Sequence, residues 1–251
     1  MDYSIDQTYE YGQTALENAL FRVNHFTQLK VMYDANYLEF KQNPTLSLFI
    51  KSEEVLKQFH LERGQTHLKF FFPENNQIDT ILEEYLKQNR YQLDRTELYV
   101  RRPVPWISNE KPPQLMIKKV THSTPIANDY LDLQYRFCLT FGQEYALGKT
   151  ALMKEQINNP SYAILLAYWN EIPIGFIHGI SIDESTFELD NFQIDESYQR
   201  KGIGTHLQAA LFQEFPKQTA ILLADGQDSP KEMYKKQGYQ FQSFMYEALK
   251  E

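Results

Sequence analysis

A cluster of prolines in the middle of the chain limits its folding more than any other feature of the sequence. Proline fixes φ and lacks a backbone N–H, so a proline-rich segment cannot continue a helix or a central strand. We therefore predict an extended linker over residues 103–113, with an N-terminal α/β lobe at 1–102 and a second domain at 114–251. The prolines of this cluster are Pro103, Pro105, Pro112 and Pro113.

The overall composition indicates a globular protein. Of the 251 residues, 42% are hydrophobic and 23% are charged, so a sizeable core can be buried. The net charge of −8, without a basic patch, argues against a nucleic-acid partner. Residues 1–13 do not read as a signal peptide, and the longest apolar run, 163–169, is too short to cross a bilayer. We expect a soluble cytoplasmic protein without a membrane partner.

Residues 114–251 alternate between predicted strands and helices. Thr124 and Ser229 are expected N-caps that precede Pro125 and Pro230, and Gly238 is expected to end the last helix. Strands are predicted at 116–120, 163–169, 172–181, 186–194, 220–224 and 239–248. Helices are predicted at 124–140, 149–157, 202–215 and 229–237, with a loop at 141–148. This pattern indicates an α/β domain of ordinary size.

The first half of the chain has weaker signals. We predict strands at 46–50 and 68–72 and helices at 14–24 and 78–87. Residues 68–93 resemble residues 221–241. Both segments read strand, loop, helix ending in Lys-Gln, then Tyr-Gln and a second strand. The N-terminal lobe is therefore either a degenerate tandem repeat of the C-terminal domain or an unrelated α/β lobe.

Residues 199–204 read Gln-Arg-Lys-Gly-Ile-Gly and lie between a predicted strand and a predicted helix. A glycine-containing turn at a helix N-terminus directs free backbone N–H groups and the positive end of the helix dipole to one point. Gly202 and Gly204 would let a phosphate approach the backbone, and Arg200 and Lys201 would add positive charge. The motif predicts a pyrophosphate site.

The residues around this motif make it specific. The stretch 192–207 resembles the acetyl-CoA signature of the GNAT superfamily of N-acetyltransferases, whose core Q/R-x-x-G-x-G/A is matched at Gln199, Gly202 and Gly204. Residues 233–239 resemble the second GNAT signature, L-Y-x-x-x-G-F, and the order of elements over 114–251 is the GNAT order. The resemblance implies an α/β (α+β) fold with a mixed, mostly antiparallel sheet flanked by helices. It also implies acetyl-CoA as the acyl donor.

The resemblance assigns the cofactor contacts residue by residue. The main chain of a bulged strand over 188–194 would contact the thioester and the pantetheine arm, and the glycine turn would hold the phosphates. The residues expected to contact acetyl-CoA are Phe192, Gln193, Ile194, Gln199, Arg200, Lys201, Gly202, Ile203, Gly204, Thr205 and Gln227. Gln227 departs from the asparagine that the family often has there. A Rossmann site is the alternative for G-x-G, but its third glycine is replaced by Leu207.

The resemblance also implies catalytic roles. Tyr234 matches the tyrosine that protonates the leaving thiolate, although a packed tyrosine on a helix would look the same. Glu188 is the candidate general base, and Asp190 follows it on the same face of the strand as a candidate contact for a cationic substrate. The alternative is that both carboxylates belong to a solvated strand face.

Other candidate residues have structural explanations. Glu144 and Tyr145, on the predicted loop 141–148, are candidate acceptor contacts. His178 is expected to be a core residue rather than a base, and His206 is expected at the surface. Cys138, the only cysteine, is expected to be a buried, inert thiol. No spacing of His, Cys or Asp suggests a metal site.

The sequence therefore favours an N-acetyltransferase that acts on a small-molecule or peptide amine, and a homodimer is compatible with this interpretation. A second interpretation is an acyl-CoA-binding sensor or a partner-binding module that has lost turnover. A third gives the N-terminal lobe the main role, in recognition of a protein or peptide.

Overall fold

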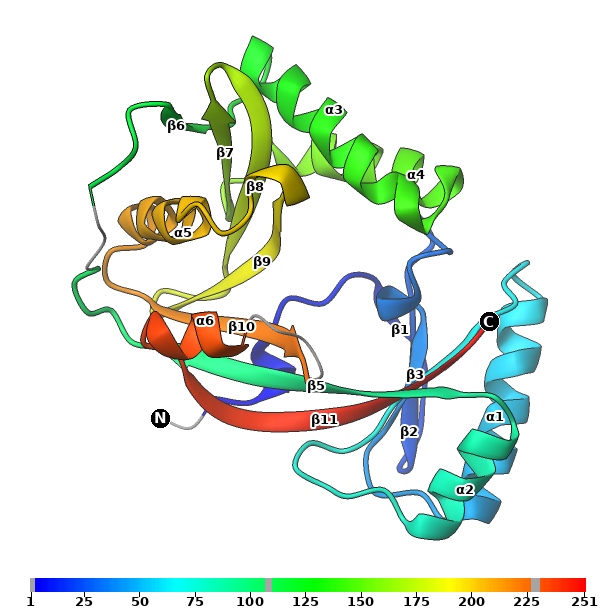
Figure 1. Ribbon diagram of the computed structural model, residues 1–251. Coiled ribbons are helices and arrows are strands. Elements are labelled where there is room, and N and C mark those ends of the chain that lie inside the picture. The colour runs from blue at the N-terminus through cyan, green and yellow to red at the C-terminus, as the bar shows by residue number, and fades with distance from the viewer. Residues whose placement is uncertain (1–2, 107–109, 227–230) are drawn as a thin grey trace. The chain divides into compact units, whose positions relative to one another are not determined.

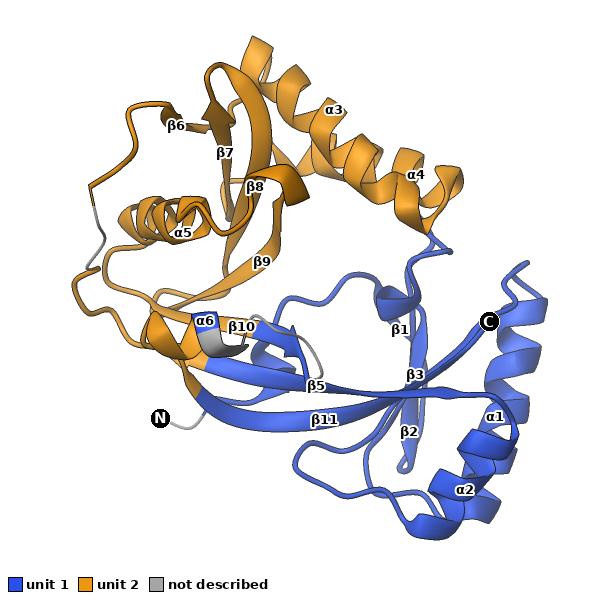
Figure 2. Ribbon diagram, viewed as in Figure 1, with its two compact units in different colours: residues 1–99, 223–233, 241–251 blue, residues 100–222, 234–240 orange. Residues whose placement is uncertain are grey.

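A computed structural model describes residues 3–106, 110–226 and 231–251 (Figure 1). The chain forms two compact units that are interleaved along the sequence (Figure 2). Unit 1 comprises residues 1–99, 223–233 and 241–251, and unit 2 comprises residues 100–222 and 234–240. The units thus follow a different division from the linker predicted at 103–113, because the chain returns to unit 1 after residue 222.

Unit 1 contains a sheet covered by two helices. Its strands lie in the order β1-β2-β3-β4-β11-β5, and α1 connects the parallel strands β3 and β4. The strands are β1 (Gln13–Glu17), β2 (Phe21–His25), β3 (Tyr37–Phe40), β4 (Leu68–Phe71), β5 (Gln92–Arg101) and β11 (Gln240–Lys250). The helices are α1 (Leu46–Leu61), α2 (Thr80–Gln88) and the 3-10 turns η1 (Ile5–Gln7) and η2 (Tyr33–Ala35).

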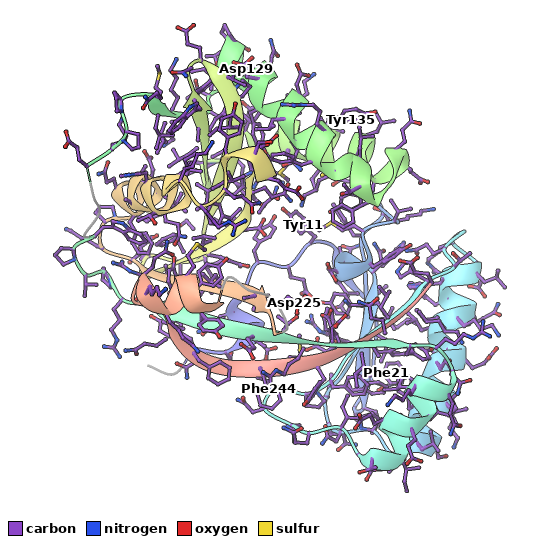
Figure 3. All side chains as sticks on the ribbon, in the orientation of Figure 1. Tyr11, Phe21, Asp129, Tyr135, Asp225 and Phe244 are labelled. Atoms are coloured by element: carbon purple, nitrogen blue, oxygen red, sulfur yellow. The ribbon has the colours of Figure 1, made fainter. Side chains whose placement is uncertain are left out.

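The core of unit 1 is rich in phenylalanine. Phe49 and Leu56 of α1 are fully buried against Phe70 of β4 and Phe40 of β3. Phe21, labelled in Figure 3, belongs to the same core. Each Å² of apolar surface that is buried stabilises the fold by about 25 cal/mol. Such a cluster is therefore the main source of stability of the unit.

Two predictions for the first half of the chain are wrong. Residues 14–24 form the β1–β2 hairpin instead of a helix, because the Asn18 side chain accepts hydrogen bonds from the N–H groups of Leu20 and Phe21 and closes a turn. Residues 46–50 form the start of α1 instead of a strand, because Thr45 caps the helix by accepting from the N–H of Leu48. The strand at 68–72 and the helix at 78–87 are confirmed by β4 and α2.

The similarity between 68–93 and 221–241 extends to the ends of the helices. Arg90 follows α2 with φ 63° and Gly238 follows α6 (Lys231–Lys236) with φ 88°. The N–H of the next residue, Tyr91 or Tyr239, bonds back to the carbonyl of Leu86 or Tyr234 in the same pattern. Leu86 thus occupies in the first lobe the place that Tyr234 occupies in the second.

Unit 2 contains a sheet with helices on both faces. The strand order is β10-β9-β8-β7-β6, antiparallel except for the parallel pair β9 and β10 that α5 connects. Figure 1 shows α3 and α4 on one side of β7–β9 and α5 on the other. The strands are β6 (Leu115–Lys119), β7 (Tyr162–Trp169), β8 (Ile172–Ser181), β9 (Thr186–Ile194) and β10 (Thr219–Asp225). The helices are α3 (Pro125–Cys138), η3 (Leu139–Phe141), α4 (Gln143–Gln156), η4 (Glu196–Tyr198) and α5 (Ile203–Glu214).

Most of the local signals in this half are confirmed. Thr124 caps α3 by accepting from the N–H of Ala127, and Asn170 and Glu171 both take positive φ in the turn between β7 and β8. The loop predicted at 141–148 is wrong, since α4 begins at Gln143 directly after Gly142, whose φ of 98° turns the chain. The predicted cap at Ser229 and Pro230 lies outside the described residues. Among the described residues, no helix is long and apolar enough to cross a membrane.

Candidate functional site

The turn between β9 and α5 leaves the first N–H groups of the helix without a side-chain cap. Helices α1, α2 and α3 are capped by Thr45, Asp79 and Thr124, whereas the N-cap of α5 is Gly202. Gly202 has φ 77°, and a Cβ at this position would have no heavy atom within 4 Å. The turn therefore offers uncapped N–H groups and open space together, as a bound phosphate requires.

The side chains of the turn are already ordered. Gln199 donates from Nε2 to the carbonyl of Ile194 at 3.1 Å and so ties the turn to the end of β9. Arg200 takes a left-handed φ of 59°. The Lys201 ammonium donates to the carbonyl of Ser197 at 3.0 Å and lies 4.8 Å from the ring centroid of Tyr198. Lys201 is thus held beside the turn by a cation–π contact.

Gly204 is required for a different reason from Gly202. A Cβ at Gly204 would lie 2.9 Å from Cζ of Phe192 and 3.4 Å from Cδ1 of Ile194. Gly204 therefore lets α5 pack closely on the end of β9. In the same turn of α5, Thr205 Oγ1 lies 3.4 Å from Nε2 of Gln237, which follows α6.

Strand β9 carries a β-bulge, as the resemblance to GNAT proteins predicted. Phe176 pairs with Gln193 and His178 pairs with Asp190, so two residues of β9 oppose one residue of β8. The first of these two residues, Asn191, has φ 41°. The pairing of β9 with β10 covers Glu188 opposite Ile221 and stops there among the described pairs. The bulged part of β9 therefore lies beyond the paired segment.

Two carboxylates and a histidine share one face of the sheet. Glu188 lies opposite Ile180, and Asp190 lies opposite His178, so these side chains point to the side of α3 and α4. Glu188 is buried, and Oδ2 of Asp190 is buried without a hydrogen-bond partner among the described residues. This placement confirms that Glu188 and Asp190 share a face, and it contradicts a solvated strand face for Glu188.

His178 is a fully buried residue, as predicted. Its Nε2 lies 2.8 Å from the hydroxyl of Tyr130, and burial, with a smaller effect of Lys149, lowers its pKa to about 3. The imidazole is therefore neutral at physiological pH. The prediction for His206 is wrong: this residue is only 8% exposed, and burial lowers its pKa.

Tyr234 lies on α6 and is 8% exposed. Its ring contacts Tyr239 edge to face at a centroid distance of 5.6 Å, and its carbonyl accepts from the N–H groups of Gln237 and Tyr239. Unit 2 thus contains the glycine turn, the bulged strand and Tyr234. Gln227 lies outside the described residues.

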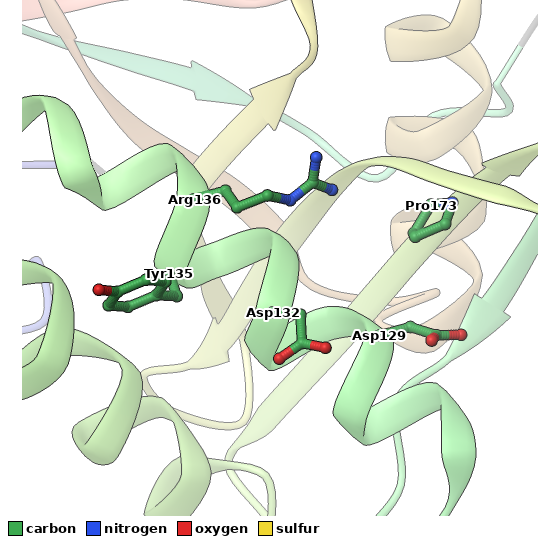
Figure 4. Close-up of a pocket in the computed structure, with 5 residues that line it drawn as sticks. All are labelled: Asp129, Asp132, Tyr135, Arg136 and Pro173. Atoms are coloured by element: carbon green, nitrogen blue, oxygen red, sulfur yellow. The ribbon is translucent and has the colours of Figure 1, made fainter.

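The predicted acceptor residues stand on a helix instead of a loop. Glu144 and Tyr145 belong to the first turn of α4, where the Tyr145 ring lies 5.4 Å from the ring of Phe141. A pocket of about 450 Å³ lies elsewhere, between α3 and the start of β8 (Figure 4). Its lining residues are Asp129, Asp132, Tyr135, Arg136 and Pro173. None of these was predicted, and Asp129 already accepts a hydrogen bond from Tyr168.

Sequence reasoning missed three residues that organise the site. Asn191 forms the bulge, Gln134 of α3 accepts a hydrogen bond from it, and Arg101 of β5 bonds the end of α6. An asparagine inside a strand is a signal for left-handed backbone, so Asn191 could have been found. Gln134 and Arg101 act over long sequence separations and carry no local signal. Among the described residues, no group of His, Cys, Asp and Glu could hold a metal ion.

Two family models match the chain, one in each half. Residues 3–99 match the model described as a domain of unknown function (DUF5613), and residues 128–248 match the model of the acetyltransferase (GNAT) domain. The glycine turn, the bulged strand and α6 all lie inside the second match. The C-terminal half of this chain is therefore a GNAT acetyltransferase domain, and it belongs to the GNAT superfamily.

One solved structure is similar to this chain over almost its whole length. A functionally unknown conserved protein from Staphylococcus epidermidis is 31% identical, with a TM-score of 0.89 over 99% of this chain and 98% of that chain. The chain therefore belongs to the same family as that protein. None of the curated proteins compared with the chain matches it.

Two more distant structures show the same fold. A GCN5-related N-acetyltransferase from Kribbella flavida has a TM-score of 0.62 at 12% identity, over 95% of this chain and 89% of that chain. A tandem GNAT protein from the clavulanic acid biosynthesis pathway has a TM-score of 0.54 at 10% identity, over 85% of this chain and 74% of that chain. The tandem arrangement fits an N-terminal lobe that is itself GNAT-like.

Proposed function

We propose that this protein transfers an acetyl group from acetyl-CoA to a primary amine of a small molecule or peptide. The observation that carries the proposal is the uncapped start of α5 at Gly202, which follows the bulged strand β9 after the 3-10 turn η4. In this proposal the N–H groups after Gly202 hold the diphosphate of the donor, and the main chain of residues 192–194 contacts the pantetheine arm.

The residues of unit 2 supply the groups that the reaction needs. The amine must lose a proton as its nitrogen bonds to the acyl carbon, and the carbon–sulfur bond breaks to release a thiolate that gains a proton. Glu188, buried on β9, is the proposed base, and Tyr234 is the proposed acid. Oδ2 of Asp190, which has no hydrogen-bond partner among the described residues, is proposed to bind the amino group of the acceptor.

The proposal is tested with the full-length protein and a panel of amines. Release of CoA thiol from acetyl-CoA should be saturable in at least one amine, from a panel of small amines, polyamines, amino acids and peptide N-termini. Binding of acetyl-CoA measured by calorimetry serves as a parallel readout that needs no acceptor. Acetyl-CoA binding without turnover over the whole panel would favour the sensor interpretation, and absence of both would contradict the proposal.

A further inference from the structure

The left-handed residue of the β9 bulge is tied to helix α3. Asn191, with φ 41°, donates from Nδ2 to Oε1 of Gln134 at 2.8 Å. An L-residue with positive φ inside a strand is strained, and asparagine is among the few side chains that tolerate it. The contact to Gln134 therefore holds a conformation that the backbone of β9 would otherwise leave.

Gln134 is itself held by buried partners. It is fully buried, and its Nε2 donates to the Cys138 sulfur at 2.9 Å, which directs Oε1 to the opposite side. The Tyr130 hydroxyl lies 3.4 Å from the same Oε1 and 2.8 Å from Nε2 of His178 on β8. A buried amide with these partners has one favourable orientation, and in it the oxygen faces Asn191.

We propose that Gln134 is a positioning residue for acyl transfer: through Asn191 it keeps the bulge of β9 in the shape that presents main-chain N–H groups to the acyl carbonyl. The inference rests on the proposed function, since it needs an acyl donor that lies along β9. It differs from a packing role because Gln134 would act only through one hydrogen bond to one residue.

A comparison of two ligands distinguishes a positioning role of Gln134 from a general effect on the stability of the fold. Acetyl-CoA has a thioester carbonyl oxygen that the bulge would contact, whereas free CoA ends in a thiol and lacks this group. The diphosphate, which both ligands share, is assigned to the turn at Gly202. A change at the bulge should therefore weaken acetyl-CoA more than CoA, because the two ligands share the pantetheine arm and only acetyl-CoA has the thioester, while a loss of folding would weaken both equally.

The first experiment measures dissociation constants of acetyl-CoA and CoA for the full-length protein by calorimetry. Gln134→Leu should weaken acetyl-CoA by about fivefold to tenfold, as expected for one hydrogen bond, and change CoA by less than twofold. Cys138→Ser is the matched control, because a serine hydroxyl can still accept from Nε2 of the amide and so keeps Oε1 facing Asn191. This control should preserve the wild-type ratio of the two constants.

The second experiment is a double-mutant cycle with Asn191→Gly. Glycine takes positive φ without a side-chain contact, so Gln134→Leu should have no further effect on acetyl-CoA in this background. If Gln134→Leu weakens acetyl-CoA equally with and without Asn191→Gly, the proposal is wrong. Equal weakening of acetyl-CoA and CoA by Gln134→Leu would also overturn it.

Two further comparisons complete the test. If Gln134→Leu does not fold, Gln134→Glu replaces it, because a glutamate oxygen can still accept from Asn191 and should keep the wild-type ratio of the two constants. If Gln134→Glu had a normal melting temperature but bound acetyl-CoA more weakly relative to CoA than the wild type does, this result would count against the proposal. Failure of the wild-type protein to bind either ligand would instead contradict the proposed function itself.

Discussion

The guanidinium of Arg101 donates from Nε to the backbone carbonyl of Gln237 at 2.7 Å, directly after the last residue of α6. Arg101 is 4% exposed, and its guanidinium carbon lies 4.4 Å from the ring centroids of both Trp106 and Phe212. A buried cation at a helix C-terminus interacts favourably with the helix dipole. Arg101 therefore anchors the helix that carries Tyr234.

We predict that Arg101→Met loosens the end of α6 while the rest of unit 2 stays folded. A hydrogen bond to a charged group contributes about 1.5–3 kcal/mol, so the amides of Gly238 and Tyr239 should exchange at least about tenfold faster in hydrogen exchange. Arg63→Met is the control, since Arg63 bonds the carbonyl of Phe59 near the end of α1. Unchanged exchange in Arg101→Met would show that Arg101 does not anchor α6.

Gly202→Val should abolish acetyl-CoA binding for a local reason. Valine at φ 77° costs about 1–3 kcal/mol of backbone strain and places methyl groups in the open space of the turn. Gly142→Val is a matched control, because Gly142 also has positive φ, also precedes a helix and also has no heavy atom within 4 Å of its added Cβ. Both variants should lose similar stability in urea unfolding. Loss of binding in both, or in neither, would contradict the assignment of the turn.

Tyr234→Phe should lower kcat and leave the Kd for acetyl-CoA nearly unchanged. The hydroxyl would act only as negative charge develops on sulfur, and a general acid is typically worth about 10²–10⁴ in rate. Tyr239→Phe is the control, because the Tyr239 ring packs on the ring of Tyr234 and its buried hydroxyl has no partner among the described residues. A kcat of Tyr234→Phe within twofold of wild type would leave Tyr234 as a packing residue.

The two halves of the chain should not fold independently. The last strand, β11, pairs with β4 over Glu247–Lys250 and Leu68–Phe71, and Ala248 belongs to the phenylalanine-rich core of unit 1. Fragment 114–251 would leave β11 without this partner and expose the edge of the strand. We expect both 1–105 and 114–251 to be unfolded or aggregated alone, and to recover a cooperative thermal transition when co-expressed. A cooperative, monomeric 114–251 would contradict this prediction.

Acid should destabilise unit 1 through three buried histidines. Burial lowers the pKa of His25, His60 and His67, that of His67 to about 4. In each ring one nitrogen already bonds an oxygen, of Asn36 or of the His67 main chain, and Nε2 of His60 has no partner among the described residues. Protonation would bury an added charge and N–H without an acceptor.

The direction of this pH dependence follows from the lowered pKa values of the three histidines in the folded state. Below the pKa of about 6.5 that histidine has in the unfolded chain, the unfolded chain binds more protons than the folded one. The histidines therefore do not lower the free energy of unfolding above this pH. The free energy of unfolding falls as the pH drops from about 6.5 toward the pKa values of the folded state. With a folded pKa of about 4, His67 alone should cost about 1.4 kcal/mol at pH 5.5, and His25 and His60 should act in the same direction. Urea unfolding at pH 7.5 and 5.5 measures this difference. His67→Gln should reduce it, whereas His122→Gln, at an exposed position, should not.

Several elements could be predicted from local sequence because their causes are local. The turn at Gly202 and Gly204, the cap at Thr124 and the stop at Gly238 each depend on the conformational preference of one or two residues, and the structure has all of them. The bulge of β9 was also predicted, through the family resemblance rather than through the residues themselves. Local errors arose where a side chain competed with propensity, as Asn18 does in the β1–β2 hairpin.

The remaining features were decided by contacts between residues far apart in the sequence. Gln134 meets Asn191 only because α3 packs on the sheet that contains β8 and β9, and Arg101 meets Gln237 only because β5 passes the end of α6. The pairing of β11 with β4 likewise joins the last strand of the chain to a strand before the proline-rich segment, so unit 1 contains residues from both sides of that segment. Sequence alone thus determined the family, the glycine turn, the cap of α3 at Thr124 and the stop at Gly238, because these depend on neighbouring residues. Tertiary packing decided how the bulge and α6 are held, because burial orients polar side chains whose partners no local pattern can name.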